Sequence, residues 1–245
     1  MIIPNLPNAP VKKVIVSCEI SENTEASIRK FGIEPLKLYG NMNVDEAVKN
    51  HPDMHFVHIS NNTLLSSKNI CSLAGEYISD FTYINSKPDN TTFVGYPDDA
   101  FLNCLVLGKY LICNTKCISN DVLKYSEKIE LEVLHVNQGY TKCNICVVNK
   151  NSIITEDNGI ASNLSEYGFR ILLLKTNSVK IKKYKYGFIG GASGKISENK
   201  LAFFGDIFSH PEYDRIYRFL YKEDVEPVAL TREPLTDYGS LMPIE

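Results

Sequence analysis

The chain has 245 residues, with 26 lysines and arginines against 29 aspartates and glutamates, for a formal net charge of −3. Its 44% apolar and 22% charged residues are typical of a globular protein. This balance excludes general disorder. The uncharged apolar stretches are far shorter than the ~20 residues of a membrane span, and the near-neutral charge argues against a nucleic-acid-binding domain. An odd number of cysteines, seven, without a secretory signal favours reduced thiols, and we expect a cytoplasmic protein.

A strand–strand–helix–strand pattern recurs along the chain. The units begin near residues 14, 55, 103, 145 and 195, where apolar runs typical of buried strands start. The first unit opens on a single strand, and a strand-like run follows each helix. Helices are expected at 21–29, 66–77, 119–126, 159–167 and 209–220, and the strands after them at 34–38, 81–84, 131–136, 169–174 and 225–230.

Helix start and stop signals support these positions. Ser21 and Ser119 are predicted as N-caps, and Gly32 and Gly168 as left-handed residues that end helices. Ser209 and Glu212 match a capping box, in which each side chain accepts from a free amide of the first helical turn.

Five units of about 49 residues fill the chain, which predicts one domain over residues 1–245. The segment from Leu235 to Ile244 is strand-like and has no helix after it. It can complete the first unit and close a ring, so that no sheet edge remains exposed. The sequence thus predicts a five-bladed α/β propeller of pseudo-fivefold repeats closed by the C-terminal strand. The alternative is an ordinary α/β domain with accidental spacing.

Such a ring resembles the pentein, or guanidine-modifying-enzyme, fold of arginine and agmatine deiminases, dimethylarginine hydrolases and amidinotransferases. A non-catalytic ribosome anti-association factor also has this fold. Within it, the chain is similar to a bacterial family without an assigned activity. The phrases that carry the resemblance are Gln138–Cys143, Tyr186–Lys195, Leu235–Ser240 and, more weakly, Tyr96–Asn103. It covers Asn103 to Ile244 well and the first hundred residues by repeat pattern alone.

The resemblance implies a cysteine nucleophile near the C-terminus, a histidine base and carboxylates that hold a guanidinium group. The chain departs from this set. No cysteine follows Cys146, and Ser240, Leu241 and Met242 stand where the nucleophile is expected. No histidine lies in the turn before the fourth or fifth unit. The usual cysteine chemistry is therefore not expected, because covalent attack needs a thiolate and a base.

The turns before the first strands of the units are predicted to point side chains at the central axis. They are rich in polar residues, and a mixed set from different units suits a small polar ligand such as an amino acid or a guanidino compound. The alternative is that the aspartates cap turns and that Lys142 is a solvated strand end. The candidate ligand-binding residues are Asp98, Asn103, Gln138, Lys142, Ser193, Asp237 and Ser240.

Gly187, Gly190, Gly191 and Gly194 precede a strand instead of opening a helix, as a dinucleotide fingerprint would. These glycines favour a tight connection between elements, or a close approach of the backbone to a neighbouring blade or a ligand.

The spacing of Cys113, Cys117, Cys143 and Cys146 superficially suggests zinc. Residues three apart on a strand face opposite sides, so Cys143 and Cys146 are not expected to converge. Cys146, Cys104 and Cys18 are predicted to be buried and inert. Cys143 is the one candidate for a reactive thiol, because the charge of Lys142 next to it can lower a thiol pKa.

His51, His55 and His58 are not expected to form a metal site, since His55 and His58 face opposite sides of a strand; scattered surface or half-buried histidines are expected instead. The basic run from Lys180 to Lys185 fits either an acidic partner or RNA, or a solvated connection.

The leading functional hypothesis is binding of a small polar metabolite in the central channel, without a metal or cofactor. A non-enzymatic interaction module, such as a ribosome-binding protein, is the first alternative. A hydrolase with a displaced thiol, Cys143, is the second. No membrane or nucleic-acid partner is expected, and the oligomeric state is not readable from the sequence.

Overall fold

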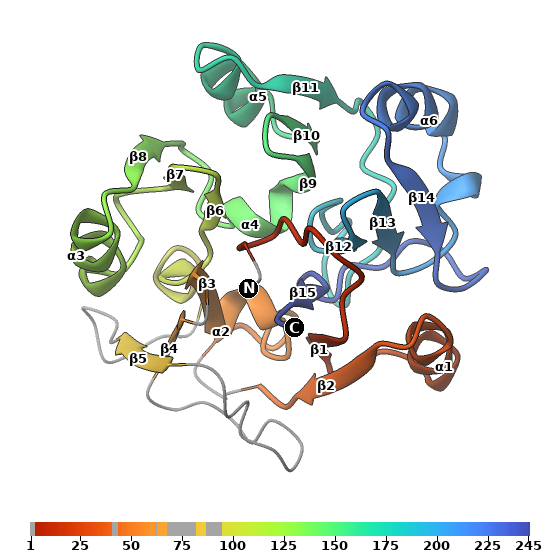
Figure 1. Ribbon diagram of the computed structural model, residues 1–245, viewed down its shortest axis with the longest axis horizontal. Coiled ribbons are helices and arrows are strands. Elements are labelled where there is room, and N and C mark those ends of the chain that lie inside the picture. Colours follow the sequence, from red (N-terminus) through yellow and green to blue (C-terminus); the bar gives the residue numbers. More distant parts are fainter. Residues whose placement is uncertain (1–2, 41–43, 62, 68–81, 87–94) are drawn as a thin grey trace.

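The computed structural model describes residues 3–40, 44–61, 63–67, 82–86 and 95–245. Within these ranges the strands form five three-stranded sheets that lie around the centre of the molecule (Figure 1). Four helices, α1 (Glu22–Lys30), α3 (Asn120–Lys128), α5 (Asn158–Ser165) and α6 (Tyr213–Lys222), lie at the periphery (Figure 1). The short helices α2 (Pro52–His55) and α4 (Thr141–Asn144) lie near the centre.

Each sheet combines an antiparallel and a parallel strand pair. In four sheets the first two strands are antiparallel, and the third, which follows an intervening connection, is parallel to the second. The strands of these sheets are β3 (Phe56–Ser60), β4 (Thr63–Ser67) and β5 (Thr82–Ser86); β6 (Leu105–Leu107), β7 (Tyr110–Cys113) and β8 (Glu132–His135); β9 (Cys146–Asn149), β10 (Ser152–Thr155) and β11 (Arg170–Leu173); and β12 (Ser193–Ser197), β13 (Lys200–Phe203) and β14 (Glu226–Ala229).

The remaining sheet joins the two ends of the chain. Strand β15 (Met242–Pro243) pairs antiparallel with β1 (Lys13–Ser17), which pairs in parallel with β2 (Glu34–Leu38). The amide of Lys12 also donates to the carbonyl of Glu245 at 2.5 Å. The prediction that the C-terminal segment completes the first unit is thus confirmed.

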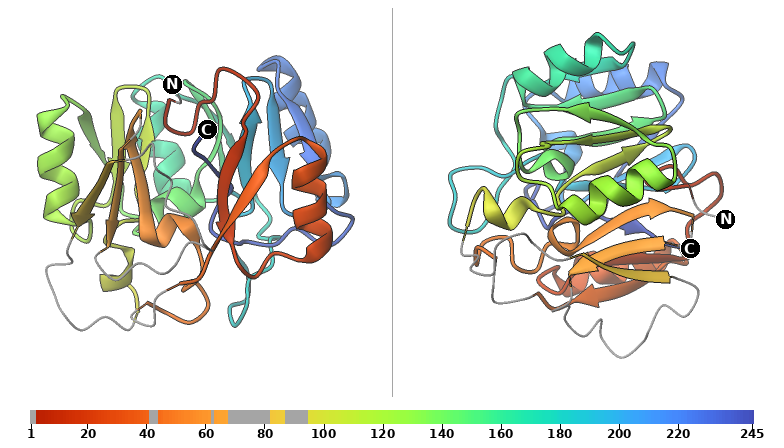
Figure 2. Two further views of the ribbon diagram at one scale, coloured as in Figure 1. Left: turned by 60° about the horizontal axis from the view of Figure 1, so that its bottom comes forward. Right: turned by 90° about the vertical axis from the view of Figure 1, so that its left-hand side faces the viewer.

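Apolar side chains between neighbouring sheets form the core. One cluster joins Ile15 of the first sheet to Phe56 of the second, and others join the second to the third, the third to the fourth and the fourth to the fifth. A further cluster packs Val14 and Val16 against Phe204 and Ile196 of the last sheet. Each sheet therefore buries apolar side chains against two neighbours, and the last packs on the first. Figure 2 shows the sheets from two further sides.

Most helix boundaries follow the local signals. Ser21 accepts a hydrogen bond from the amide of Thr24, and Ser119 from that of Asp121, so both predicted N-caps are confirmed. Gly32 and Gly168 have φ of 74° and 81°, the left-handed conformation that suits glycine at a helix end.

Two predicted helix starts are wrong. Ser66 and Ser67 belong to strand β4 and do not begin a helix, and residues 68–77 of that prediction lie outside the described residues. Ser209 ends a 3-10 turn, η2 (Ile207–Ser209), and helix α6 begins four residues later without a side-chain cap. Glu212 instead accepts from the amides of Lys175 and Thr176, so the expected capping box is absent.

No helix in the described ranges is long and apolar enough to span a membrane.

Candidate functional site

Polar side chains from the turns that precede the sheets meet at the centre of the molecule. Each of the first, second, third and fourth sheets contributes at least one of them, and the fifth contributes its glycine-rich turn. None of these side chains is more than 7% exposed. We call this group the central cluster; its members are His51, Asp53, Asn103, Lys142, Cys143, Asp237 and Ser240.

The structure brings four of the seven predicted ligand-binding residues into this cluster, namely Asn103, Lys142, Asp237 and Ser240. The other three lie apart. Asp98 is exposed in the 3-10 turn η1 (Asp98–Ala100), and the amide of Gln138 bonds to Asp157 at 3.3 Å. Ser193 is buried beside the cluster, where its hydroxyl donates to the carbonyl of Gly190 at 3.3 Å.

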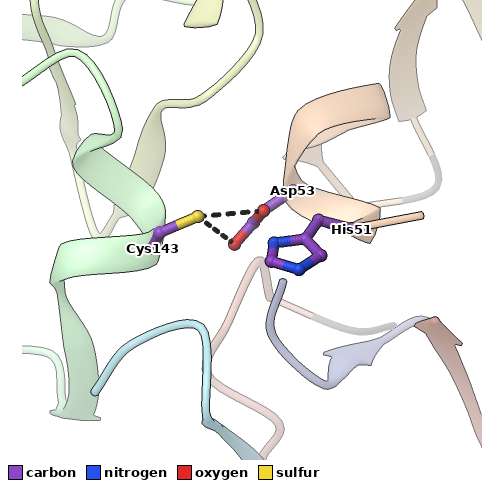
Figure 3. Close-up of side chains that lie close together, drawn as sticks. All are labelled: His51, Asp53 and Cys143. Carbon is purple, nitrogen blue, oxygen red and sulfur yellow. Dashed lines mark hydrogen bonds between the residues drawn. The ribbon is translucent and has the colours of Figure 1, made fainter. Parts of the chain in front are cut away.

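The carboxylate of Asp53 contacts several other members of the cluster (Figure 3). Cys143 Sγ lies 3.2 and 3.1 Å from its two oxygens, and Ser240 Oγ donates to Oδ2 at 2.8 Å. Lys142 Nζ donates to Ser240 Oγ at 2.9 Å. A hydroxyl therefore links the buried ammonium group to the buried carboxylate.

Asn103 fixes the turn that carries Lys142 and Cys143. Its Oδ1 accepts from the amide of Lys142 at 2.7 Å, and its Nδ2 lies 3.2 Å from Cys143 Sγ and from the carbonyl oxygen of Asp53. One buried amide group thus orients the thiol and connects the turns before the second and fourth sheets.

Asp237 is the second buried carboxylate. Its Oδ2 accepts from the amide of Phe188 and its Oδ1 from that of Gly239, both at 3.0 Å. Nδ1 of His51 lies 3.6 Å from Oδ1 and has no hydrogen-bond partner. Burial raises the pKa of Asp237 to about 6 and also raises that of Asp53, to which the negative charge of Asp237 contributes.

The expected lowering of the Cys143 pKa is wrong. Burial raises the pKa of this thiol well above its usual value, and the adjacent Asp53 carboxylate raises it further. The ammonium group of Lys142 does not act on the thiol as expected, because it is bound to Ser240. Cys143 also lies in helix α4, directly before strand β9, and is only 2% exposed.

His51 and Asp53 were not among the predicted site residues. They flank Pro52 in the turn before the second sheet. Asn103 and Asp237 were predicted as site residues because they lie in the corresponding turns of other units. His55 and His58 are buried rather than at the surface or half-buried, and each bonds to a backbone carbonyl, of Lys49 and Asn61 respectively.

The remaining described cysteines do not converge on a zinc site. Cys146 lies in one apolar cluster and Cys104 and Cys113 in another, and all three are buried. The predicted burial is confirmed for Cys146 and Cys104, whereas Cys18 is partly exposed. That these thiols are inert stays a prediction.

The glycines of the fifth turn allow close backbone contact, as predicted. A Cβ atom on Gly190 would lie 2.5 Å from the carbonyl oxygen of Cys143, and one on Gly194 2.1 Å from that of Leu241. On Gly191 it would lie 1.9 Å from Oδ1 of Asp237. The turn therefore packs directly against the central cluster.

A hairpin of residues 180–186, here called the strap, extends from the Asp237 turn to the segment before His51. Its base is held by the amide of Asp237, which donates to the carbonyl of Lys180 at 2.8 Å. Ile181 packs against Ala47, Val48 and Met54. Lys182 pairs with Glu19, Lys183 with Glu46, and Tyr184 donates to Asp45. The basic run thus meets acidic groups of this same chain.

Two cavities within the described part of the chain differ in size and in their distance from the central cluster. One of about 10 Å³, room for about one water molecule, is lined by Lys142, Ser193 and Lys195. A larger cleft of about 690 Å³ lies between the first and fifth sheets, and no residue of the central cluster lines it. The chemistry of the central cluster, not cavity size, makes it the candidate site.

Glu156 lies at the edge of the cluster, where its Oε2 accepts from the amide of Ile189 at 3.0 Å and its Oε1 has no partner. Burial raises its pKa from 4.5 to about 7. The folded protein therefore binds a proton more readily than the unfolded chain between these pH values. Folding becomes less favourable as the pH rises through this window, and the penalty is complete above about pH 7.

We expect Glu156→Gln to raise the free energy of unfolding at pH 8 by on the order of 1–3 kcal/mol, because the buried charge is removed. At pH 4.5 the gain should largely vanish. Urea unfolding at the two pH values measures the difference, and Glu166→Gln, at an exposed position, is the control. An equal effect of Glu156→Gln at both pH values would contradict the assigned shift.

Comparison with solved structures places this arrangement among known folds. The chain is similar to the inosamine-phosphate amidinotransferase of Streptomyces griseus, with 10% identity, a TM-score of 0.58 and coverage of 100% of this chain and 97% of that one. It is also similar to a substrate-bound agmatine deiminase of C. jejuni, with 13% identity, a TM-score of 0.54 and coverage of 99% and 96%. At these identities the likeness shows the fold, which is the pentein fold.

No curated protein matches the sequence. A family model described as a family of unknown function, DUF6873, matches residues 15–242. Since this match spans nearly the whole chain, the protein belongs to the DUF6873 family.

Proposed function

We propose that this protein binds a small cation of the guanidino or amino-acid type in its central cluster, at the axis of a single five-bladed pentein-like propeller formed by residues 1–245. Its free thiols fit the reducing cytoplasm as its location. The observation that carries the proposal is the meeting of two buried carboxylates, Asp53 and Asp237, with one buried ammonium group, Lys142.

The charge of the cluster favours a monovalent cation. Two carboxylates and one ammonium group leave a net charge of −1 while the thiol is protonated and His51 is neutral. A buried net charge is unfavourable in a medium of low dielectric constant, and a bound cation neutralises it. A guanidinium group offers five planar N–H donors, enough to bond to both carboxylates.

The structural neighbours support this chemistry. Their names describe an amidinotransferase and an agmatine deiminase, and both modify or transfer guanidino-type groups. The proposed ligand site consists of Asn103, Lys142, Asp237 and Ser240, together with Asp53. In it Lys142 sets the net charge, and the other side chains contact the ligand. Asp98, Gln138 and Ser193 are proposed to act only at a distance from the ligand, because they lie outside the cluster.

The strap is the proposed entrance. Its ion pairs to Glu19 and Glu46 are exposed, and exposed ion pairs are weak and screened by salt. Its base bonds to the backbone of Asp237, so displacement of the strap would open the side of the cluster that holds this carboxylate.

A second candidate function, hydrolysis by Cys143, is favoured by the 3.1 Å distance from its Sγ to Asp53. Sulfur would attack the guanidinium carbon while its proton passes to Asp53 or His51. The C–N bond would break and ammonia would leave with that proton. Water would then cleave the C–S bond, releasing a urea-type product and restoring the thiol.

The test compares agmatine, L-arginine and methylguanidine with the neutral analogue citrulline in a thermal-shift assay. The cations should raise the melting temperature, because a ligand of the folded state stabilises it by mass action. Asp53→Asn and Asp237→Asn should each weaken binding by about tenfold or more, since a charged hydrogen bond is lost. Asp98→Asn, at an exposed acid outside the cluster, should bind normally.

The second candidate is separated by measuring ammonia release from each cation. Cys143→Ser should retain binding and lose any ammonia release. If no cation shifts the wild-type melting temperature, or if Asp98→Asn loses binding as Asp237→Asn does, the proposed function is wrong. Binding without ammonia release would leave the protein as a binding protein.

A further inference from the structure

Three possible metal ligands meet at the centre of the cluster. One ligand atom each of His51, Asp53 and Cys143 lies within 4.8 Å of the others, and these residues form the only such group within the described residues (Figure 3). Imidazole, carboxylate and thiolate are the ligands that proteins use for zinc. Tetrahedral ligands at 2.0–2.3 Å from zinc lie about 3.3–3.7 Å apart. The distances from Sγ to the Asp53 oxygens, 3.1 and 3.2 Å, are close to this spacing.

The unpaired histidine nitrogen is a second, independent observation. His51 is 1% exposed, and its Nδ1 has no hydrogen-bond partner. Buried nitrogen atoms are nearly always paired, so an unpaired one requires an explanation. Figure 3 shows the imidazole ring beside the Asp53 carboxylate, on the side away from Cys143. A cation bound among these groups would satisfy the ring.

Once a metal ion has displaced the thiol proton, the charge balance of the cluster also fits a divalent ion. With the thiol deprotonated, Asp53, Asp237 and Cys143 carry three negative charges, and Lys142 carries one positive charge. A divalent cation brings the buried sum to zero. Asn103, whose Nδ2 lies 3.2 Å from Sγ, and Asp237, beside His51, are placed to orient two of the ligands.

We propose that His51, Asp53 and Cys143 form a binding site for a zinc-type divalent transition-metal ion, with the fourth position open to water or to Ser240 Oγ. Binding forms a metal–sulfur bond and breaks the S–H bond, and the proton leaves to solvent without any change of oxidation state. The site goes beyond the proposed function, because its ligand is a metal ion. The metal ion and the guanidino cation should compete, because each is proposed to bind to Asp53.

The test titrates the full-length, metal-free protein with Co²⁺ and then with Zn²⁺. We expect one ion per chain, a thiolate-to-cobalt charge-transfer band in the near ultraviolet, visible bands typical of tetrahedral cobalt, and loss of all of them when Zn²⁺ displaces Co²⁺. His51→Gln and Cys143→Ser each remove a ligand, so each should weaken Zn²⁺ binding by more than the ~10–100-fold that the loss of an outer-shell partner costs, and the second should abolish the thiolate band. Cys117→Ser, the same substitution outside the cluster, should behave as wild type.

A second measurement covers the case in which a variant fails to fold. Wild-type protein is alkylated with and without Zn²⁺, and the modified peptides are identified by mass spectrometry. Zn²⁺ should protect Cys143 and leave the alkylation of Cys117 unchanged. A wild type without a thiolate band, a band that survives in Cys143→Ser, or equal alkylation of Cys143 with and without Zn²⁺ would each overturn the proposal.

The two proposals fail separately. Zinc binding without any melting-temperature shift from agmatine, L-arginine or methylguanidine would refute the proposed function and support the metal site. A shift from one of these cations without a cobalt band would refute the metal site alone.

Discussion

Gly191→Ala is expected to destabilise the protein by about 1–3 kcal/mol and to displace the Asp237 carboxylate. The added Cβ would lie 1.9 Å from Oδ1 and 2.4 Å from Cγ of Asp237. This carboxylate cannot swing away freely, because it is 2% exposed and accepts hydrogen bonds from the amides of Phe188 and Gly239. Urea unfolding measures the loss, and ligand titration should show a parallel loss of cation binding.

The control is Gly95→Ala, where an added Cβ meets no atom within 4 Å and should change stability by less than about 0.5 kcal/mol. A double-mutant cycle with Asp237→Ala isolates the cause. If the clash with the carboxylate dominates, Gly191→Ala should cost much less in the Asp237→Ala background. Full additivity of the two substitutions would show that the cost of Gly191→Ala arises elsewhere.

The convergence of polar turns was predictable because it follows from the order of elements. A strand that starts at the centre places the turn before it at the centre, whichever unit it belongs to. This reasoning selected Asn103, Lys142, Asp237 and Ser240, which do meet. The prediction failed for Asp98, because this residue lies at the start of the 3-10 turn η1, well before strand β6, and is exposed.

The same reasoning, applied to the second unit, selects His51 and Asp53. They were missed because a histidine before a proline is typical of a loop, and because the three nearby histidines were assessed together as one metal site. Only the fold shows that Asp53 lies beside Cys143, 90 residues away in sequence. Burial, together with the adjacent Asp53 carboxylate, also reverses the expected shift of the Cys143 pKa. Proximity in sequence to Lys142 does not fix where the ammonium group of Lys142 points.

The errors at the helix starts arise where partners distant in sequence override a local motif. Serine is a common N-cap, but Ser66 pairs with Phe56 on one side and Asn85 on the other. Ser209 and Glu212 have the spacing of a capping box. The carboxylate of Glu212 instead accepts hydrogen bonds from two backbone amides that follow strand β11. Tertiary partners thus override a motif whose local contribution is only about 1 kcal/mol.

Lys142→Met is expected to lower the free energy of unfolding by about 2–4 kcal/mol at neutral pH, because two buried carboxylates lose their balancing cation. Lys142 is 7% exposed, and it reaches Asp53 through the hydroxyl of Ser240. The net charge of the cluster changes from −1 to −2. A monovalent guanidino cation should therefore bind more tightly to the variant than to the wild type, and agmatine should restore part of the lost stability.

Lys195→Met is the matched control for this prediction. Lys195 is a second buried lysine, 3% exposed, but its ammonium group bonds to the carbonyls of Val148 and Glu198 and not to a carboxylate. Burial lowers its pKa to about 8, so removing its charge should cost less than removing that of Lys142, and agmatine should bind as to wild type. If Lys142→Met instead abolishes agmatine binding while it remains folded, Lys142 holds the ligand directly. The charge balance among Asp53, Asp237 and Lys142 would then not be the basis of recognition.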